Sequence, residues 1–324
     1  MTRVSRRTVF ALAVLSLAVP GIALADPAKE VRIDWATYNP VSMLLKQKGF
    51  LEKEFAKDGI KVTWVKTVSS ANALQFLSAG SIDFGSTAGS AALVGKINGN
   101  PIKSIYVYSR PEWTALVTGK DSKINTLADL KGKRVAMVRG TDPHIFLVRA
   151  LLSAGLTDKD IQPVLVQQHA DGGTALLRGD VDAWAGLDPM MAQHEIKDGA
   201  KLFYRKPEAN TWGILNSREE FLKDNPAITR RVLAAYEEAR KYSLAHYDEL
   251  KKIFIGVTNL DGAVVDKQLK ERTDLTHNRI GPAQRDSILE AGLALQKAGV
   301  IKSGIDVKKA LDDLVADEYV PVTN

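Results

Sequence analysis

The chain has 324 residues, of which 44 are Lys or Arg and 38 are Asp or Glu, and it contains no cysteine. The absence of cysteine excludes disulfide bonds, thiol catalysis, thiolate metal sites and a lipid-modified N-terminal cysteine. Basic and acidic residues are nearly balanced and evenly spread, which argues against nucleic acid as a partner.

The first 25 residues have the layout of an export signal. Three arginines, two of them adjacent, precede an apolar run that ends in Ala23-Leu24-Ala25. We expect cleavage after Ala25, which leaves a periplasmic chain of 299 residues. Both the twin-arginine and the general secretory route remain open. No later run reaches the ~18 apolar residues that a membrane-spanning helix needs, so we expect no membrane anchor.

Strand and helix patterns alternate over the first two thirds of the chain. Residues 31–38 have a strand pattern, and a helical pattern with Gly59 as its stop follows. The segment 60–68 alternates as a strand, and a helix begins at residues 69–70. The same unit recurs over 133–155. This alternation predicts mostly parallel sheets with helices on both faces.

An internal match predicts two lobes of similar build. Residues 71–89 align without gaps to residues 170–188, which lie 99 positions later. Four identities fall in this alignment, namely Ala71 with Ala170, Leu77 with Leu176, Gly80 with Gly179 and Asp83 with Asp182. From residue 217 onward the sequence is charged and helical, and Ser217 with Glu220 matches the capping-box pattern. These C-terminal helices are expected to brace one lobe.

The sequence lacks the motifs of common enzymes. The five histidines are widely spaced and include no HExxH pair. The segment 89–96 has the wrong spacing for a phosphate-binding loop, and Thr87 stands where a nucleophile elbow requires serine. We therefore expect no catalytic residues, no cofactor and no metal.

Five predicted loops, each between a strand and a helix, form the candidate site. They are residues 38–42, 68–70, 85–88, 140–144 and 186–189. In open α/β sheets ligands bind at the carboxyl ends of strands, so loops of this kind from two lobes would face a shared cleft. Helix N-termini that converge there favour an oxyanion. For Ser86 and Thr87, simple helix capping is the alternative.

The phrases LSAGSIDFGS, LADLKGKRVAM, LLSAGLTDKDIQPVLV and ALLRGDVDAWAGLDPMMA occur in series. Together with the export signal, they resemble the periplasmic binding proteins of ABC importers for aliphatic sulfonates, taurine and nitrate. The resemblance implies an α/β, two-lobed periplasmic-binding-protein fold of the Venus-flytrap type II, with a ligand cleft between the lobes. It implies lobe 1 at 26–113 and 212–324 and lobe 2 at 114–211.

The resemblance and the side-chain chemistry together give the candidate ligand-binding residues. The family's loops correspond to Tyr38, Ser69, Ser70, Ser86, Thr87, Gly140, Thr141 and Asp188. Other candidates are Asn39 in the first loop, Trp113 for the organic tail, Arg110 as a fork for the oxyanion, Trp184 and His144. A core role for Trp184, a surface role for His144 and an N-cap role for Asp188 remain open.

The resemblance implies a monomeric, non-enzymatic binding protein that captures a small organic anion and delivers it to a membrane permease. An aliphatic sulfonate is the expected ligand. Taurine, nitrate, phosphonates, a thiamine pyrimidine precursor and other small organic acids remain alternatives. An enzyme of thiamine-pyrimidine synthesis and the effector domain of a cytoplasmic regulator share the architecture, but neither is expected to carry an export signal.

Overall fold

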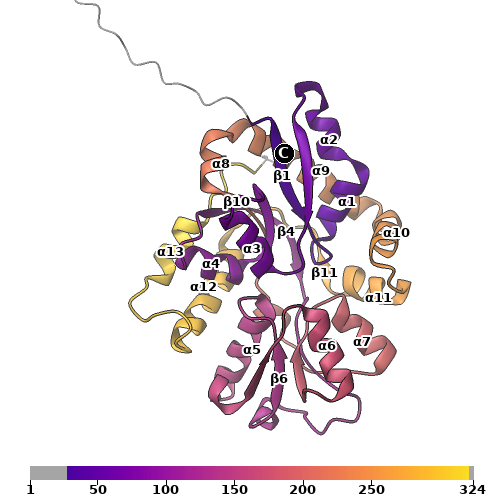
Figure 1. Cartoon of the computed structure of the whole chain (residues 1–324), viewed down its shortest axis with the longest axis vertical. Coiled ribbons are helices and arrows are strands. Elements are labelled where there is room, and N and C mark those ends of the chain that lie inside the picture. Colours follow the sequence, from indigo (N-terminus) through magenta and orange to yellow (C-terminus); the bar gives the residue numbers. More distant parts are fainter. Residues whose placement is uncertain (1–27, 321–324) are drawn as a thin grey trace, which may run out of the picture.

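The computed structural model describes residues 28–320, which form two α/β lobes, each with its own sheet (Figure 1). The first sheet has the strand order β11-β4-β10-β3-β1-β2, and the second has the order β7-β6-β8-β5-β9. Within these residues, no helix is long and apolar enough to cross a membrane. The expected signal over 1–25 lies outside the described residues.

The first part of lobe 1 alternates strands and helices as predicted. Its elements are β1 (Glu30–Trp35), α1 (Pro40–Lys48), α2 (Phe50–Phe55), η1 (Ala56–Asp58), β2 (Lys61–Lys66), α3 (Ser70–Ser78), β3 (Phe84–Ala88), α4 (Gly89–Ile97) and β4 (Ile102–Pro111). The predicted single helix before Gly59 is two helices, because Gly49 adopts a left-handed conformation with φ 62° between α1 and α2.

Lobe 2 repeats this alternation around the second sheet. Its elements are β5 (Leu116–Thr118), η2 (Leu127–Leu130), β6 (Arg134–Met137), α5 (Asp142–Ser153), η3 (Asp158–Asp160), β7 (Gln162–Leu165), α6 (His169–Arg178), β8 (Ala183–Ala185), α7 (Met190–Asp198), β9 (Lys201–Tyr204) and η4 (Pro207–Ala209). The lobe boundaries expected at 113/114 and 211/212 remain a proposal. The change of sheet between β4 and β5, and again between β9 and β10, supports it.

The chain then returns to lobe 1. It forms β10 (Gly213–Arg218), α8 (Glu219–Asp224), α9 (Pro226–Ala245), α10 (Tyr247–Thr258), α11 (Gly262–Asp266), η5 (Lys267–Glu271), β11 (Thr273–Asp274), α12 (Pro282–Lys297) and α13 (Val307–Leu314). The predicted capping box is wrong. Ser217 belongs to β10, where its Oγ donates to the Asp83 carbonyl at 2.8 Å, and Arg218 precedes α8 as the N-cap.

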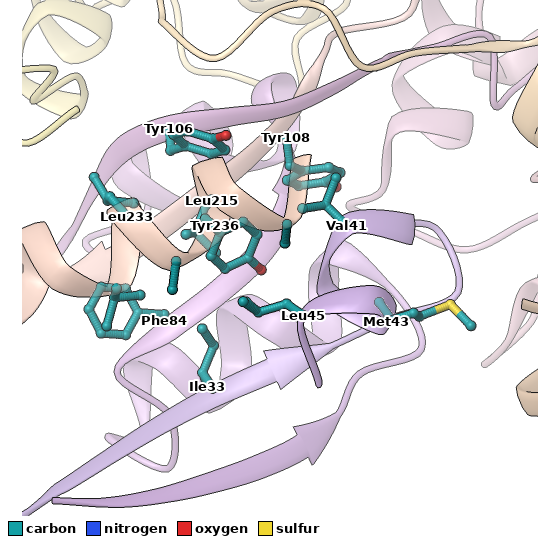
Figure 2. Packing of buried hydrophobic residues seen from close by; sticks show 14 of the residues in the cluster. Ile33, Val41, Met43, Leu45, Phe84, Tyr106, Tyr108, Leu215, Leu233 and Tyr236 are labelled. Carbon is teal, nitrogen blue, oxygen red and sulfur yellow. The ribbon is translucent and has the colours of Figure 1, made fainter. Parts of the chain in front are cut away.

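The C-terminal helices cover the first sheet and complete its core. Figure 2 shows Leu233 and Tyr236 of α9 packed with Phe84 and Leu215 of the sheet, and Val41 of α1 lies on the same side. On the opposite side of the lobe, α12 and α13 pack on α4. The predicted bracing role of these helices is thus visible in the packing.

The internal sequence match corresponds to a structural repeat. In lobe 1, the backbone N–H of Arg32 donates to Asp83 at 2.9 Å, and the guanidinium pairs with the same carboxylate at 2.7 Å. In lobe 2, Arg134 makes the same contacts with Asp182 at 2.8 and 2.9 Å. The parallel strands β2-β1-β3 therefore correspond to β7-β6-β8.

Candidate ligand-binding site

A small cavity, with about 230 Å³ of empty space including its open mouth, lies between the two lobes. Its walls combine hydroxyl, aromatic and apolar groups and include no Lys or Arg. The lining residues are Tyr38, Ser69 and Ser70 of lobe 1, Trp113 of the first crossing, and Thr141, Asp142, Pro143, His169 and Leu187 of lobe 2.

The cavity lies where parallel strands end in both lobes. Tyr38 lies between β1 and α1, Ser69 between β2 and α3, and Thr141 between β6 and α5. His169 begins α6 after β7, and Leu187 lies between β8 and α7. Carboxyl ends of parallel strands are the usual ligand-binding edge of an open α/β sheet.

Three helices, α3, α5 and α6, begin at the cavity. The first turn of a helix carries free N–H groups and a partial positive charge, so this arrangement suits an anion. Ser69 Oγ accepts the N–H of Asn72 at 3.2 Å, and Ser70 Oγ accepts the N–H of Ala88 at 3.0 Å. Each hydroxyl therefore keeps its hydrogen for a ligand.

A buried carboxylate, Asp34, orders the lobe 1 wall. Its Oδ2 accepts from Thr67 Oγ1 at 2.7 Å, and Thr67 Oγ1 lies 3.1 Å from the Tyr38 hydroxyl. Ser86 donates to Asp34 through its backbone N–H at 2.9 Å and through its Oγ at 2.7 Å. Burial raises the pKa of Asp34 to about 6, while these hydrogen bonds oppose that rise.

A second carboxylate, Asp142, joins the lobes beside the cavity. Ser90 of lobe 1 donates its Oγ to Asp142 Oδ1 at 2.5 Å, and Trp113 donates its Nε1–H to Oδ2 at 2.8 Å. Thr211 of the second crossing donates its hydroxyl at 2.5 Å and its N–H at 3.2 Å. Four donors occupy this carboxylate, so it acts as part of the wall.

The residues predicted from the sequence divide into two groups. Those that line the cavity are Tyr38, Ser69, Ser70, Trp113 and Thr141. Those that do not line it are Asn39, Ser86, Thr87, Arg110, Gly140, His144, Trp184 and Asp188.

The prediction of a loop at 85–88 is wrong, because these residues belong to β3. Ser86 and Thr87 are fully buried. Ser86 Oγ donates to Asp34 at 2.7 Å and accepts from Asn39 Nδ2 at 2.8 Å. Thr87 Oγ1 accepts from Asn216 Nδ2 at 2.8 Å. These hydroxyl groups are engaged within the protein.

The remaining candidates have other surroundings. Arg110 is exposed and lies 5.4 Å from the ring centroid of Trp212. Trp184 is fully buried in the core of lobe 2. Asp188 is buried, and both its oxygens lie 3.2 Å from Nη1 of Arg272. Arg272 of lobe 1 therefore balances the negative charge of Asp188.

Gly140 and His144 line a second, larger cavity, about 1220 Å³ in empty volume including its open mouth. Arg139 lies on the same wall, and α12 of lobe 1 forms the facing side. Burial, and then the charge of Arg139, lower the pKa of His144 to about 4.

Asp142, Pro143 and Leu187 also line the cavity and lie in the predicted loops 140–144 and 186–189, although they are not among the ligand-binding candidates. Sequence reasoning missed His169, which lies outside all five predicted loops. For His169 a signal exists in the internal repeat, since the offset of 99 residues places it opposite Ser70. Both residues are the first of their helices, α3 and α6.

Residues 43–250 match the family described as NMT1/THI5 like. The chain belongs to the NMT1/THI5-like family. Proteins named as aliphatic sulfonates-binding proteins are 28% identical to it in both Escherichia coli and Bacillus subtilis, over 81% and 88% of this chain and 82% and 86% of theirs. A protein of Uromyces fabae named 4-amino-5-hydroxymethyl-2-methylpyrimidine phosphate synthase is 29% identical over 63% of each chain.

Solved structures place the NMT1/THI5-like chain among periplasmic-binding-protein folds. The alkanesulfonate-binding protein SsuA of Xanthomonas axonopodis pv. citri, bound to MOPS, has a TM-score of 0.81 at 24% identity and covers 90% of this chain and 100% of its own. The periplasmic SsuA of Escherichia coli has a TM-score of 0.74 at 25% identity and covers 87% and 91%. The predicted family and the predicted two-lobed α/β fold are confirmed.

Proposed function

We propose that this chain is an exported solute-binding protein that captures a small organic anion, an aliphatic sulfonate, and delivers it to an ABC permease. The convergence of three helix N-termini on one cavity between two lobes carries this proposal. A sulfonate offers three oxygens that accept hydrogen bonds in different directions, which suits donors from α3 of lobe 1 and from α5 and α6 of lobe 2.

The apolar part of the cavity supplies a place for the organic tail. Tyr38 and Trp113 meet edge to face, with ring centroids 6.1 Å apart and an interplanar angle of 82°. Pro143 and Leu187 complete this side. Aromatic and aliphatic walls beside a few polar groups are typical of sites for small organic molecules.

An enzyme of the same fold is the second candidate, since the family includes proteins named as pyrimidine phosphate synthases. The relatives named for sulfonate binding match a larger share of this chain, 81% and 88% against 63%. We therefore propose binding without turnover. The family resemblance also supports a periplasmic, monomeric protein.

Calorimetry with ethanesulfonate, MOPS, taurine, nitrate and methylphosphonate tests the proposal, followed by mass analysis of the recovered ligand. We expect one alkanesulfonate to bind each chain and to be recovered unchanged. Burial of its tail should give a negative heat-capacity change on binding. Failure of both ethanesulfonate and MOPS to bind, or recovery of a chemically altered product, would overturn the proposal.

A further inference from the structure

One buried imidazole of the cavity has no bonding role within the protein. His169 is 2% exposed and lines the cavity. Its Nδ1 has no hydrogen-bond partner, and no hydrogen bond within residues 28–320 reaches its Nε2. Buried polar groups in native proteins are nearly always paired, so each exception calls for an explanation.

Three other polar side chains of the cavity are satisfied by the protein. Asp142 accepts from four donors, and Thr141 Oγ1 donates to the Val138 carbonyl at 2.7 Å. The Tyr38 hydroxyl donates to the Ser86 carbonyl at 3.1 Å. Among these groups, His169 therefore has bonding capacity that the protein does not use.

The position of His169 repeats that of Ser70 in the other lobe. Each residue begins a helix that follows a parallel strand, and each lines the same cavity. Ser70 has a free hydroxyl hydrogen, because its oxygen accepts from Ala88. The repeat thus sets one side-chain donor from each lobe against the same space.

His169 is a neutral donor. Burial lowers its pKa to about 4, so at neutral pH the ring has one N–H donor and one acceptor nitrogen. The N-terminus of α6, which lies at the same position, also disfavours a positive charge on the ring.

We infer that the His169 imidazole binds the ligand directly and donates its ring N–H to the oxyanion from lobe 2, while Ser70 donates from lobe 1. The inference rests on the proposed function and deepens it, because it names the side-chain pair that makes the anion a bridge between the lobes. It also implies that His169 is retained for binding at the expense of the unliganded fold, since its ring is unpaired until the ligand arrives.

The test compares His169→Phe, His169→Asn and the control His246→Phe with the unsubstituted protein. Phenylalanine keeps a flat ring without polar atoms, and asparagine restores a donor. His246 is exposed between α9 and α10 and lies outside the cavity. Calorimetry with ethanesulfonate gives the affinity, and thermal unfolding without ligand gives the melting temperature.

We expect His169→Phe to weaken ethanesulfonate binding about 10- to 150-fold, the range for a hydrogen bond to a charged group. Its unliganded melting temperature should stay equal or rise. His169→Asn should recover part of the affinity, and His246→Phe should bind as the unsubstituted protein does. Unchanged affinity in His169→Phe would overturn the role of His169 and leave the proposed function intact.

A second measurement uses the unsubstituted protein, so its result does not depend on how the variants fold. In the unsubstituted protein labelled with ¹⁵N in its histidine rings, saturating ethanesulfonate should shift the His169 ring nitrogens. Binding without such a shift would overturn the inference alone. If the unsubstituted protein binds neither ethanesulfonate nor MOPS, the proposed function falls, and the inference falls with it.

Discussion

The buried carboxyl group of Asp34 determines how the lobe 1 wall of the cavity is held. Three hydrogen bonds from Thr67 and Ser86 reach this carboxyl, and Tyr38 is tied to it through Thr67. This arrangement could not be predicted from the sequence, because Asp34 lies within a predicted strand between the apolar residues Ile33 and Trp35. The contacts depend on β1, β2 and β3 lying side by side.

The Asp34 carboxyl carbon should titrate near pH 6 in a ¹³C spectrum, because burial raises its pKa from 3.8 to about 6. A raised carboxyl pKa means that the neutral form is favoured in the fold. The contribution of protonated Asp34 to the free energy of unfolding is therefore fully present below about pH 4, and it is lost as the pH rises through 6. Asp182 is the control, since its hydrogen bonds with Arg134 lower its pKa. A pKa of Asp34 below the pKa of Asp182 would contradict the account.

Two serine substitutions separate ligand contact from support of the fold. Ser70→Ala removes a donor from the cavity and should weaken ethanesulfonate binding by about 10-fold or more. Ser86→Ala removes a donor to Asp34 and an acceptor for Asn39, and should cost about 1–3 kcal/mol of unfolding free energy with a smaller effect on binding. If Ser86 contacts the ligand, as the sequence predicts, Ser86→Ala will instead weaken binding at unchanged stability.

The connections between strands and helices show how far elements could be predicted. Four of the five expected loops lie between a strand and a helix, although residues 40–42, 70 and 142–144 already belong to α1, α3 and α5. The fifth, residues 85–88, lies in strand β3. These residues and the following Gly89 are small because Leu77 of α3 and Ile288 of α12 approach them closely. A Cβ on Gly85 would lie 2.9 Å from Leu77 Cδ1, and one on Gly89 would lie 2.5 Å from Ile288 Cδ1. Small residues resemble a loop locally, and only tertiary packing explains them.

Helix α6 is held close to the second sheet by glycine. A Cβ on Gly172 would lie 2.5 Å from Nε1 of Trp184, whose side chain is fully buried and cannot yield. Gly172→Ala should displace α6 and the His169 that begins it. We expect a loss of about 1–3 kcal/mol in unfolding free energy, together with weaker ethanesulfonate binding.

Gly256→Ala is the matched control in helix α10, where no atom lies within 4 Å of an added Cβ. It should stabilise the protein by roughly 0.5–1 kcal/mol, because alanine loses less backbone entropy in a helix. Equal effects of the two substitutions on stability and binding would show that Gly172 has no packing role.

At the scale of the whole molecule, buried polar contacts hold the two lobes together. Arg272 of lobe 1 pairs with Asp188 and Glu195 of lobe 2, and Ser90 of lobe 1 bonds Asp142 of lobe 2. The internal repeat allowed the two lobes to be predicted from the sequence. These contacts could not be predicted, because their partners lie 84, 77 and 52 residues apart.

Arg272→Met should favour the open form. It leaves the buried charge of Asp188 without its partner, and opening of the lobes lets water reach that carboxylate. Loss of one member of a buried pair costs about 3–5 kcal/mol, so the unliganded radius of gyration in solution scattering should increase and ethanesulfonate affinity should fall. The control is Lys308→Met, which removes an exposed ion pair with Asp312 and should change neither the radius of gyration nor the affinity. An unchanged radius and affinity in Arg272→Met would contradict a closing role.

A crystal structure with ethanesulfonate tests the central claim most directly. The account predicts one sulfonate between the lobes, with its oxygens within hydrogen-bond distance of Ser70 and His169 and its ethyl group against Tyr38 and Trp113. A sulfonate bound instead in the cavity of Arg139 and His144, with the first cavity empty, would contradict the account.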